Sequence, residues 1–214
     1  MQNKGLIEIN NKKFDKCESC VKSKFTKKPF PTVKRDTSIL ELIHSDIREL
    51  NGTLTRGGKR YFITFCDDFS RFFFHVYILH SKDEAFEAFE LYKAEVENQK
   101  EKRIKILRLD RGGDNFSHEF DTFCKENGIK HERTSPFTPQ QNGLAERKNR
   151  TLVEMVNCML NQSGLPTNLW GEALLTACHI HNRITSRVIP TSPYELWKGR
   201  KPNLNYFRVW GCIA

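Results

Sequence analysis

The chain lacks any run of about 18 apolar residues, and its first residues lack the apolar stretch of a secretory signal peptide. We therefore expect no transmembrane helix and no signal segment. Low-complexity segments and internal repeats are also missing. Cysteine is sparse and odd in number, with seven residues scattered along the chain. This usage favours reduced thiols in a cytosolic or nuclear setting over a disulfide framework.

The composition that remains is that of a folded, basic protein. Its 214 residues are 38% hydrophobic and include 16 Phe, which is enough for a core. The net charge of +9 is uneven, because Lys12–Arg35 holds nine Lys or Arg against Asp15 and Glu18. Such a stretch attracts polyanions and releases counterions when it binds phosphates, although a solubilising arm would have the same composition. We expect nucleic-acid contacts from Lys22, Lys24, Lys27 and Lys28.

One cysteine pair has the spacing of zinc ligands. Cys17 and Cys20 form a Cys-x2-Cys motif, but a structural zinc site usually has four ligands. No histidine precedes Cys17 and no second cysteine pair follows nearby. We therefore expect this zinc half-site to bind no zinc stably. The remaining cysteines fall in apolar patterns and are expected in the core: Cys66, Cys124, Cys158, Cys178 and Cys212.

Hydrophobic periodicity predicts an alternation of strands and helices, and hence an α/β fold. Runs rich in Phe, Ile, Val and Tyr predict strands at 42–47, 60–67, 72–79, 104–109 and 129–134. Apolar residues three to four apart predict helices at 83–99, 119–127, 141–162 and 165–184. The first three strands can pair as an antiparallel meander. Residues 185–214 contain three prolines and are expected to form an irregular tail.

Three acidic residues lie on separate predicted elements. Asp46 is within the first strand, Asp110 ends the fourth strand before Gly112 and Gly113, and Glu146 lies near the start of a helix, with 35 residues between it and Asp110. Each acid alone has an ordinary reading as an edge, turn or helix-start residue. Together they offer the hard oxygen ligands that a pair of divalent metal ions needs for phosphate chemistry.

The residues around these acids resemble the integrase catalytic core of copia-type (Ty1/copia) retrotransposons, in the retroviral integrase superfamily. The resemblance is carried by Tyr61–Arg71, Leu107–Gly113, Pro136–Leu152 and the tail from Thr191 to Cys212. The block around Glu146 is the most specific part. Two mild departures are Asp114, where the family usually has Glu, and Arg111, where Asn is frequent.

The resemblance implies a ribonuclease-H-like fold, a mixed five-stranded sheet flanked by helices, with a basic N-terminal arm and an irregular C-terminal tail. It also implies that Asp46, Asp110 and Glu146 are catalytic and bind two Mg²⁺ or Mn²⁺ ions. The expected partner is double-stranded DNA, both element ends and target, with 3′-end processing and strand transfer in the nucleus by a homo-oligomer. Residues next to Glu146 are expected to contact DNA: Gln140, Gln141, Asn142, Arg147, Lys148 and Arg150. For Gln140, Gln141 and Asn142, a role in forming the turn before the helix explains the residue types equally well.

This interpretation divides the chain into three parts. Residues 1–35 are expected to be a truncated zinc-module remnant with a basic arm, 36–185 the catalytic core, and 186–214 a truncated extension of the core. Asp67 and Asp68 are assigned to a hairpin turn, and His44 to a structural or substrate-side contact. Two other functions stay open. One is a ribonuclease-H-like nuclease without strand transfer, and the other is a catalytically silent DNA-binding remnant of a decayed element.

Overall fold

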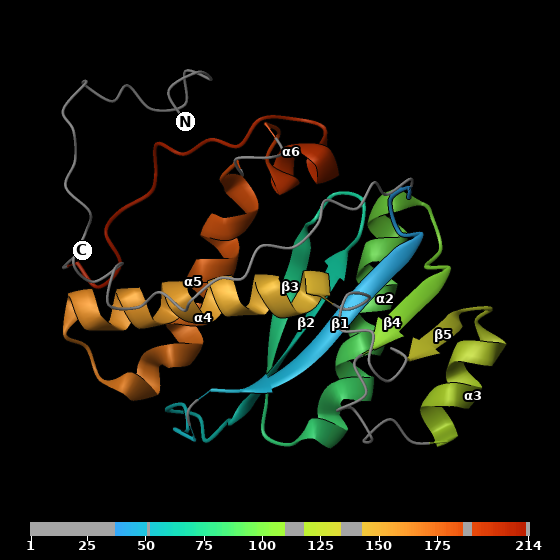
Figure 1. Cartoon of the computed structure of the whole chain (residues 1–214), viewed down its shortest axis with the longest axis horizontal. Helices are drawn as coiled ribbons and strands as arrows, with labels where there is room; N and C mark the ends of the chain where they lie inside the picture. Colours follow the sequence, from blue (N-terminus) through green and yellow to red (C-terminus); the bar gives the residue numbers. More distant parts are fainter. Residues whose placement is uncertain (1–36, 51, 110–117, 134–142, 186–189, 213–214) are drawn as a thin grey trace.

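A mixed five-stranded sheet forms the centre of the chain (Figure 1). The computed structural model describes residues 37–50, 52–109, 118–133, 143–185 and 190–212. The predicted N-terminal arm, with its lysines and the zinc half-site at Cys17 and Cys20, lies outside these ranges. So do Asp110 and the predicted DNA contacts Gln140, Gln141 and Asn142.

The strands follow the order β3-β2-β1-β4-β5. Their bounds are Leu42–Glu49 for β1, Tyr61–Asp67 for β2, Phe73–Leu79 for β3, Ile106–Leu109 for β4 and Lys130–Arg133 for β5. The antiparallel pairs β1–β2 and β2–β3 form the predicted meander, and β4 and β5 join in parallel beyond β1. The central strand β1 therefore lies between an antiparallel and a parallel neighbour.

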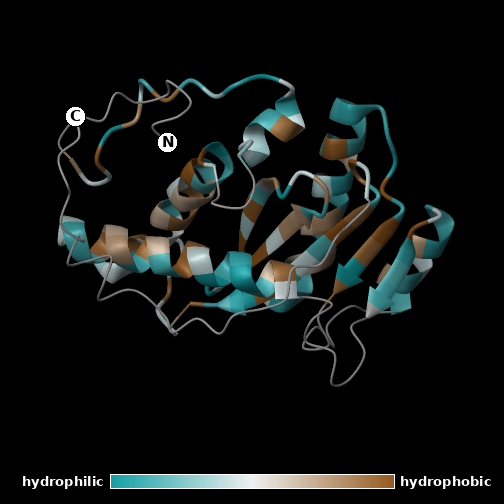
Figure 2. Ribbon diagram, turned by 45° about the horizontal axis from the view of Figure 1, so that its top comes forward, coloured by the Kyte–Doolittle hydropathy of each residue, from teal (hydrophilic) through white to brown (hydrophobic). Residues whose placement is uncertain are grey.

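Helices cover both faces of this sheet, as Figures 1 and 2 show. On one face lie α2 and α3, and on the other lie α4 and α5. Their bounds are Ala85–Lys100 for α2, His118–Glu126 for α3, Gly143–Ser163 for α4 and Trp170–Arg183 for α5, with short 3₁₀ helices at Lys82–Glu84 (η2) and Thr167–Leu169 (η3). The predicted α/β fold with a mixed five-stranded sheet is confirmed. No helix of the described residues is long and apolar enough to cross a membrane.

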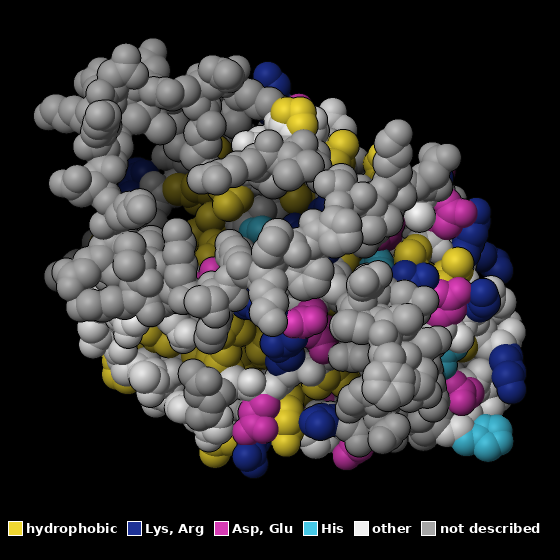
Figure 3. All heavy atoms as spheres, in the orientation of Figure 1, with side chains coloured by type: hydrophobic (Ala, Val, Ile, Leu, Met, Phe, Trp, Pro, Cys, Tyr) yellow, Lys and Arg dark blue, Asp and Glu magenta, His cyan; other side chains and the backbone are white. Residues whose placement is uncertain are grey.

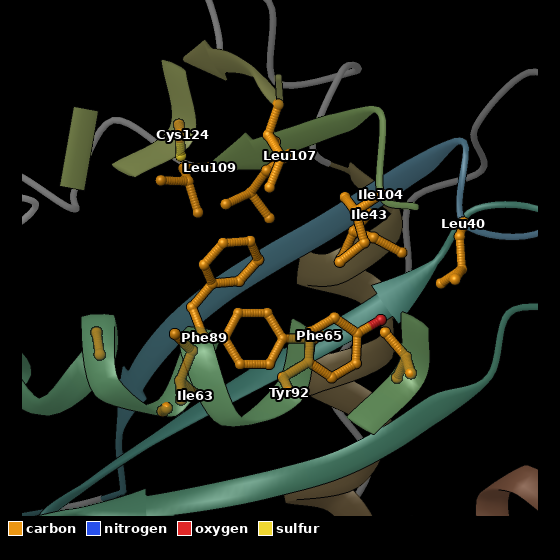
Figure 4. Packing of buried hydrophobic residues seen from close by; sticks show 14 of the residues in the cluster. Leu40, Ile43, Ile63, Phe65, Phe89, Tyr92, Ile104, Leu107, Leu109 and Cys124 are labelled. Carbon is orange, nitrogen blue, oxygen red and sulfur yellow. The ribbon is translucent and has the colours of Figure 1, made fainter. Parts of the chain in front are cut away.

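Aromatic side chains fill the core between the sheet and α2. Phe65 of β2 stacks on Tyr92 of α2, with ring centroids 4.6 Å apart, and its ring also lies 5.7 Å from Phe89 (Figure 4). All three side chains are at most 1% exposed. Because Phe and Tyr each bury a large apolar area, these rings contribute much of the hydrophobic stabilisation of this layer.

The core on the opposite face includes an anchor between α5 and β3. Asn182 of α5 accepts a hydrogen bond from the backbone N–H of Phe73 at 2.9 Å, and its side-chain amide donates to the carbonyl of the same residue. At the other end of the helix, the indole N–H of Trp170 donates to the carbonyl of Thr53 at 2.8 Å. These bonds hold α5 against β3 and against the loop that follows β1, without involving α4.

Two sequence expectations about the C-terminal part need correction. The tail contains a short helix, α6, at Pro193–Lys198. Ser192 caps it by accepting a hydrogen bond from the N–H of Glu195, and proline is favourable at the first helical position. Cys212 was expected in the core but is exposed, and Cys158 is only half-buried, whereas Cys66, Cys124 and Cys178 are buried as predicted.

Candidate active site

Strand β1 presents three of its polar side chains to the α4 side of the sheet. Successive side chains of a strand point to opposite faces. Ile43 and Ile47 belong to the core under α2, so His44, Asp46 and Arg48 face the other way. On neighbouring β2, Phe62 and Cys66 pack in the core under α4 and α5, which places Thr64 on that same side.

The carboxylate of Asp46 is held through one of its oxygens. Oδ2 accepts a hydrogen bond from Arg48 Nε at 2.9 Å and another from Asn149 Nδ2 at 3.0 Å. The side chain of Asp46 is only 10% exposed. Among the described residues, no donor contacts Oδ1. One oxygen of the carboxylate is thus held in place by two donors.

Asn149 connects this carboxylate to the rest of the sheet. Its side chain is fully buried, and its Oδ1 accepts a hydrogen bond from the hydroxyl of Thr64 at 2.9 Å. Thr64 orients the amide of Asn149, and the amide orients Asp46. Such supporting contacts around a metal ligand commonly set its orientation and basicity. The chain of bonds joins β2, β1 and α4.

Glu146 lies one turn before Asn149 on α4. Residues three apart on a helix share a face, so Glu146 belongs to the side of α4 that carries Asn149. Its Oε1 accepts a hydrogen bond from Arg150 at 2.7 Å, and its side chain is 43% exposed. This half-exposed side chain lies at the edge of the buried face of α4, next to buried Ala145.

Two of the three predicted metal ligands are therefore described, and their chemistry fits a hard divalent cation. Mg²⁺ prefers carboxylate oxygens, and Asp46 and Glu146 each have an oxygen that no described donor contacts. Asp110 lies outside the described residues. It follows Leu109, the last residue of β4, which pairs with Ser45 next to Asp46. No group of three or more His, Cys, Asp or Glu within the described ranges could hold a metal ion.

A second buried polar cluster lies beside the site, at the turn between β2 and β3. His44 Nε2 is 2.9 Å from Asp68 Oδ1, and both side chains are almost fully buried. Asp67 accepts hydrogen bonds from the N–H and hydroxyl of Ser70 at 2.7 and 2.6 Å. Burial raises the pKa of Asp67, while the hydrogen bonds from Ser70 and Leu40 oppose that rise. The acids shape the turn, as predicted, and His44 makes a structural contact.

The three basic residues beside Glu146 differ in placement. Arg147 is exposed, and its Nε donates to the carbonyl of Gly143. Arg150 is half-buried and paired with Glu146. Lys148 turns toward α5, where its Nζ lies 2.8 Å from His181 Nε2. On the face shown in Figure 3, acidic and basic side chains lie next to one another rather than in separate patches.

The roles of Asn149, Thr64 and the Lys148–His181 pair were not predicted from the sequence. The sequence did contain a sign that Asn149 is buried. Asn149 falls on the apolar stripe of α4, three residues before Leu152, and a buried polar side chain needs a hydrogen-bond partner. Its partners could not be identified, because Thr64 is 85 residues away in sequence and Asp46 is 103 residues away.

Known proteins resemble this chain in both sequence and fold. Residues 39–139 match the integrase core domain family. The Pol polyprotein of transposon TNT 1-94 from Nicotiana tabacum is 41% identical over 202 residues, covering 92% of this chain and 15% of that protein. The Pol polyprotein of transposon RE1 from Arabidopsis thaliana is 33% identical over 217 residues, covering all of this chain and 14% of that protein. The chain thus spans about a seventh of these relatives.

Solved structures show the same fold at lower sequence identity. The catalytic core of HTLV-2 integrase in complex with magnesium superposes with a TM-score of 0.57 and 19% identity, covering 76% of this chain and 99% of that one. A simian T-cell lymphotropic virus intasome structure gives a TM-score of 0.62 and 19% identity, covering 92% and 74%. These matches confirm the ribonuclease-H-like fold. The chain belongs to the integrase core family, as it occurs in the Pol polyproteins of copia-type retrotransposons.

Proposed function

We propose that the chain is a polynucleotidyl transferase that trims DNA 3′ ends and joins them to target DNA. The observation that carries this proposal is the orientation of Asp46. Two donors, from Arg48 and Asn149, hold one oxygen of this carboxylate on the central strand, and Asn149 ties it to α4, the helix that also carries Glu146. Such preorganisation suits a group that must hold a metal ion in a fixed place.

Asp46, Asp110 and Glu146 would hold two Mg²⁺ or Mn²⁺ ions. Ions bound there supply an activated oxygen nucleophile, either water or a DNA 3′-hydroxyl, and stabilise the leaving oxygen. The chain's own contribution is geometric. Asn149 fixes Asp46 relative to α4, and Arg48 holds the same oxygen of the carboxylate. With water as nucleophile the reaction is end trimming, and with a 3′-hydroxyl it is strand transfer.

The substrate that fits this site is double-stranded DNA. Arg147 is exposed beside Glu146, and Arg150 lies one turn further along α4. Guanidinium groups bind phosphates in paired, planar geometry, and such contacts fix the register of a protein on a duplex. Outside the described residues, the basic arm and Gln140, Gln141 and Asn142 are further proposed contacts. Because integration targets chromosomal DNA, we propose that the chain acts in the nucleus and as a homo-oligomer.

A strand-release assay tests the proposed function, because this reaction needs mainly the metal-binding acids. A branched DNA that mimics a joined element end is incubated with the 214-residue chain and Mg²⁺ or Mn²⁺, and release of the 3′ end is measured. We expect weak, metal-dependent release that Glu146→Gln abolishes, because this change keeps the shape of the side chain but removes its charge. Asp46→Asn and Asp110→Asn should have the same effect.

The result also separates the alternatives. Hydrolysis without any rejoined strand would favour a ribonuclease-H-like nuclease. DNA binding without metal-dependent chemistry would favour a silent DNA-binding remnant. Undiminished release by the Glu146→Gln variant would show that the assignment of the site is wrong.

A further inference from the structure

Lys148 occupies an unusual position for a lysine. It lies in the first turns of α4, two residues after Glu146, but its side chain runs inward to α5 and the turn between β2 and β3. Its Nζ is 2.8 Å from His181 Nε2 and 3.4 Å from the carbonyl oxygen of Arg71. It also lies 5.5 Å from the centre of the Phe73 ring, within the range of a cation–π contact.

These contacts define the direction of the hydrogen bonds. An ammonium group has only donors, so Nε2 of His181 accepts and the ring carries its proton on Nδ1. Burial lowers the pKa of Lys148, and burial together with the charge of Lys148 lowers the pKa of His181 to about 3. His181 is therefore neutral near pH 7 and able to act as an acceptor. The ammonium group of Lys148 is thus held by two neutral acceptors, His181 Nε2 and the carbonyl oxygen of Arg71.

Placing an ammonium group away from water is costly unless hydrogen bonds compensate. A solvent-facing side chain would avoid that cost, and neighbouring Arg147 does so. Lys148 instead joins three elements, since its two partners lie on α5 and in the β2–β3 turn. Both partners are fixed without it, because Asn182 anchors α5 to Phe73 and Asp67 caps the turn.

The contact of Lys148 thus restrains the start of α4 against a rigid frame. Asn149 restrains the same turn from the sheet side through Thr64 and Asp46. Two consecutive residues therefore fix the helix start in two directions. Glu146 is carried by this turn.

We propose that Lys148 is a positioning residue that holds Glu146 in its metal-binding place through His181 and the carbonyl of Arg71, rather than a DNA contact. This proposal rests on the proposed function, because it needs Glu146 to be a metal ligand. It replaces the role that sequence reasoning gave to Lys148, and it gives opposite roles to two adjacent cations of α4.

Two measurements on two neighbouring variants test the proposal. Mn²⁺ affinity of the 214-residue chain is measured without DNA by electron paramagnetic resonance, with Glu146→Gln as the background. Binding to a DNA duplex is measured separately as a function of salt. We expect Lys148→Met to weaken Mn²⁺ binding about 10-fold, as changes in supporting residues do, and to leave the salt dependence unchanged. Arg147→Gln should leave Mn²⁺ affinity unchanged and reduce the salt slope by about 1.

Controls separate positioning from general stability. Phe89→Leu changes a buried ring of α2, on the opposite face of the sheet, and should lower the melting temperature without changing Mn²⁺ affinity. His181→Gln keeps an acceptor for Lys148 and should bind Mn²⁺ as the wild type does, whereas His181→Leu should resemble Lys148→Met. If Lys148→Met does not fold, the comparison of His181→Gln with His181→Leu tests the proposal, again by Mn²⁺ affinity.

Lys148→Met with wild-type Mn²⁺ affinity and a reduced salt slope would overturn the proposal and make Lys148 a DNA contact. Equal Mn²⁺ affinities of His181→Gln and His181→Leu would also overturn it. If the wild-type chain binds no more Mn²⁺ than Glu146→Gln does, the proposed function itself fails.

Discussion

The side-chain amide of Asn149 donates to Oδ2 of Asp46 at 3.0 Å and so joins two residues 103 positions apart in the chain. The same amide group accepts from Thr64, which makes Asn149 the link between the central strands and α4. This relationship explains how the fold can set the relative placement of two acids that lie on different elements.

The first prediction concerns this link. Asn149→Ala should lower the free energy of unfolding by about 2 kcal/mol, because it leaves the buried hydroxyl of Thr64 and one bond of Asp46 without their partner. It should also weaken Mn²⁺ binding, whereas Phe89→Leu, in the core on the opposite face of the sheet, should lower stability only. Urea unfolding and Mn²⁺ titration measure the two effects. Thr64→Ser should behave as wild type and Thr64→Val should not, and equal behaviour of both would refute the link.

The second prediction concerns Arg150. Its pairing with Glu146 is a half-exposed i, i+4 contact, so Arg150→Gln should change the free energy of unfolding by less than about 0.5 kcal/mol. If Arg150 contacts a DNA phosphate, the same variant should bind DNA more weakly, with a salt slope lower by about 1. Fluorescence anisotropy at several salt concentrations measures this slope. Unchanged affinity and slope would exclude Arg150 from the DNA-binding surface.

A third prediction follows from the lowered pKa of His181, which is about 3 in the folded chain against an ordinary value of 6.5. Between these pH values the unfolded chain binds a proton at this histidine that the folded chain does not. The folded state should therefore lose about 1.4 kcal/mol of stability per pH unit as pH falls below 6.5. His181→Gln should remove this part of the acid sensitivity. Parallel stability curves for variant and wild type from pH 6.5 to 5 would contradict the assignment.

The aromatic core under α2 gives the fourth prediction. Phe65→Ala should lower the free energy of unfolding by about 4 kcal/mol, since it removes a fully buried ring stacked on Tyr92 and leaves a cavity. Leu91→Ala on the same helix is the matched control, because Leu91 is 57% exposed and should change stability by less than about 0.5 kcal/mol. Chemical denaturation measures the free energy of unfolding of both variants, and equal losses of stability would contradict the prediction.

The fold was predictable because its signals are local. Alternation and turn residues located β1, β2 and β3, and helical periodicity located α2 and α4. The short helix α6 was missed although its signals, Ser192 as cap and Pro193 at the first position, are local too. The three prolines of residues 185–214 favour an irregular tail as well, so the local signals of this region conflict.

The polar contacts of the site could not be read from the sequence in the same way. Periodicity alone puts Lys148 on the buried stripe of α4, three residues after Ala145 and four before Leu152. Its charge favoured a solvent-facing interpretation, and its partner His181 lies 33 residues further along the chain. Which buried polar groups meet is decided by the packing of α4 against α5, and that packing is a property of the tertiary structure.

The central claim is that Asp46, Asp110 and Glu146 bind catalytic metal ions together. Anomalous diffraction from crystals of the chain grown with Mn²⁺ tests it most directly. We expect one or two Mn²⁺ ions, about 3.5–4 Å apart if two are bound, with oxygen ligands from all three acids and with Oδ1 of Asp46 on the metal. The carboxylate carbons of the three acids should lie within roughly 5–9 Å of one another, as a shared metal pair requires. Mn²⁺ bound elsewhere, or any of the three acids on the far side of the sheet, would contradict the account.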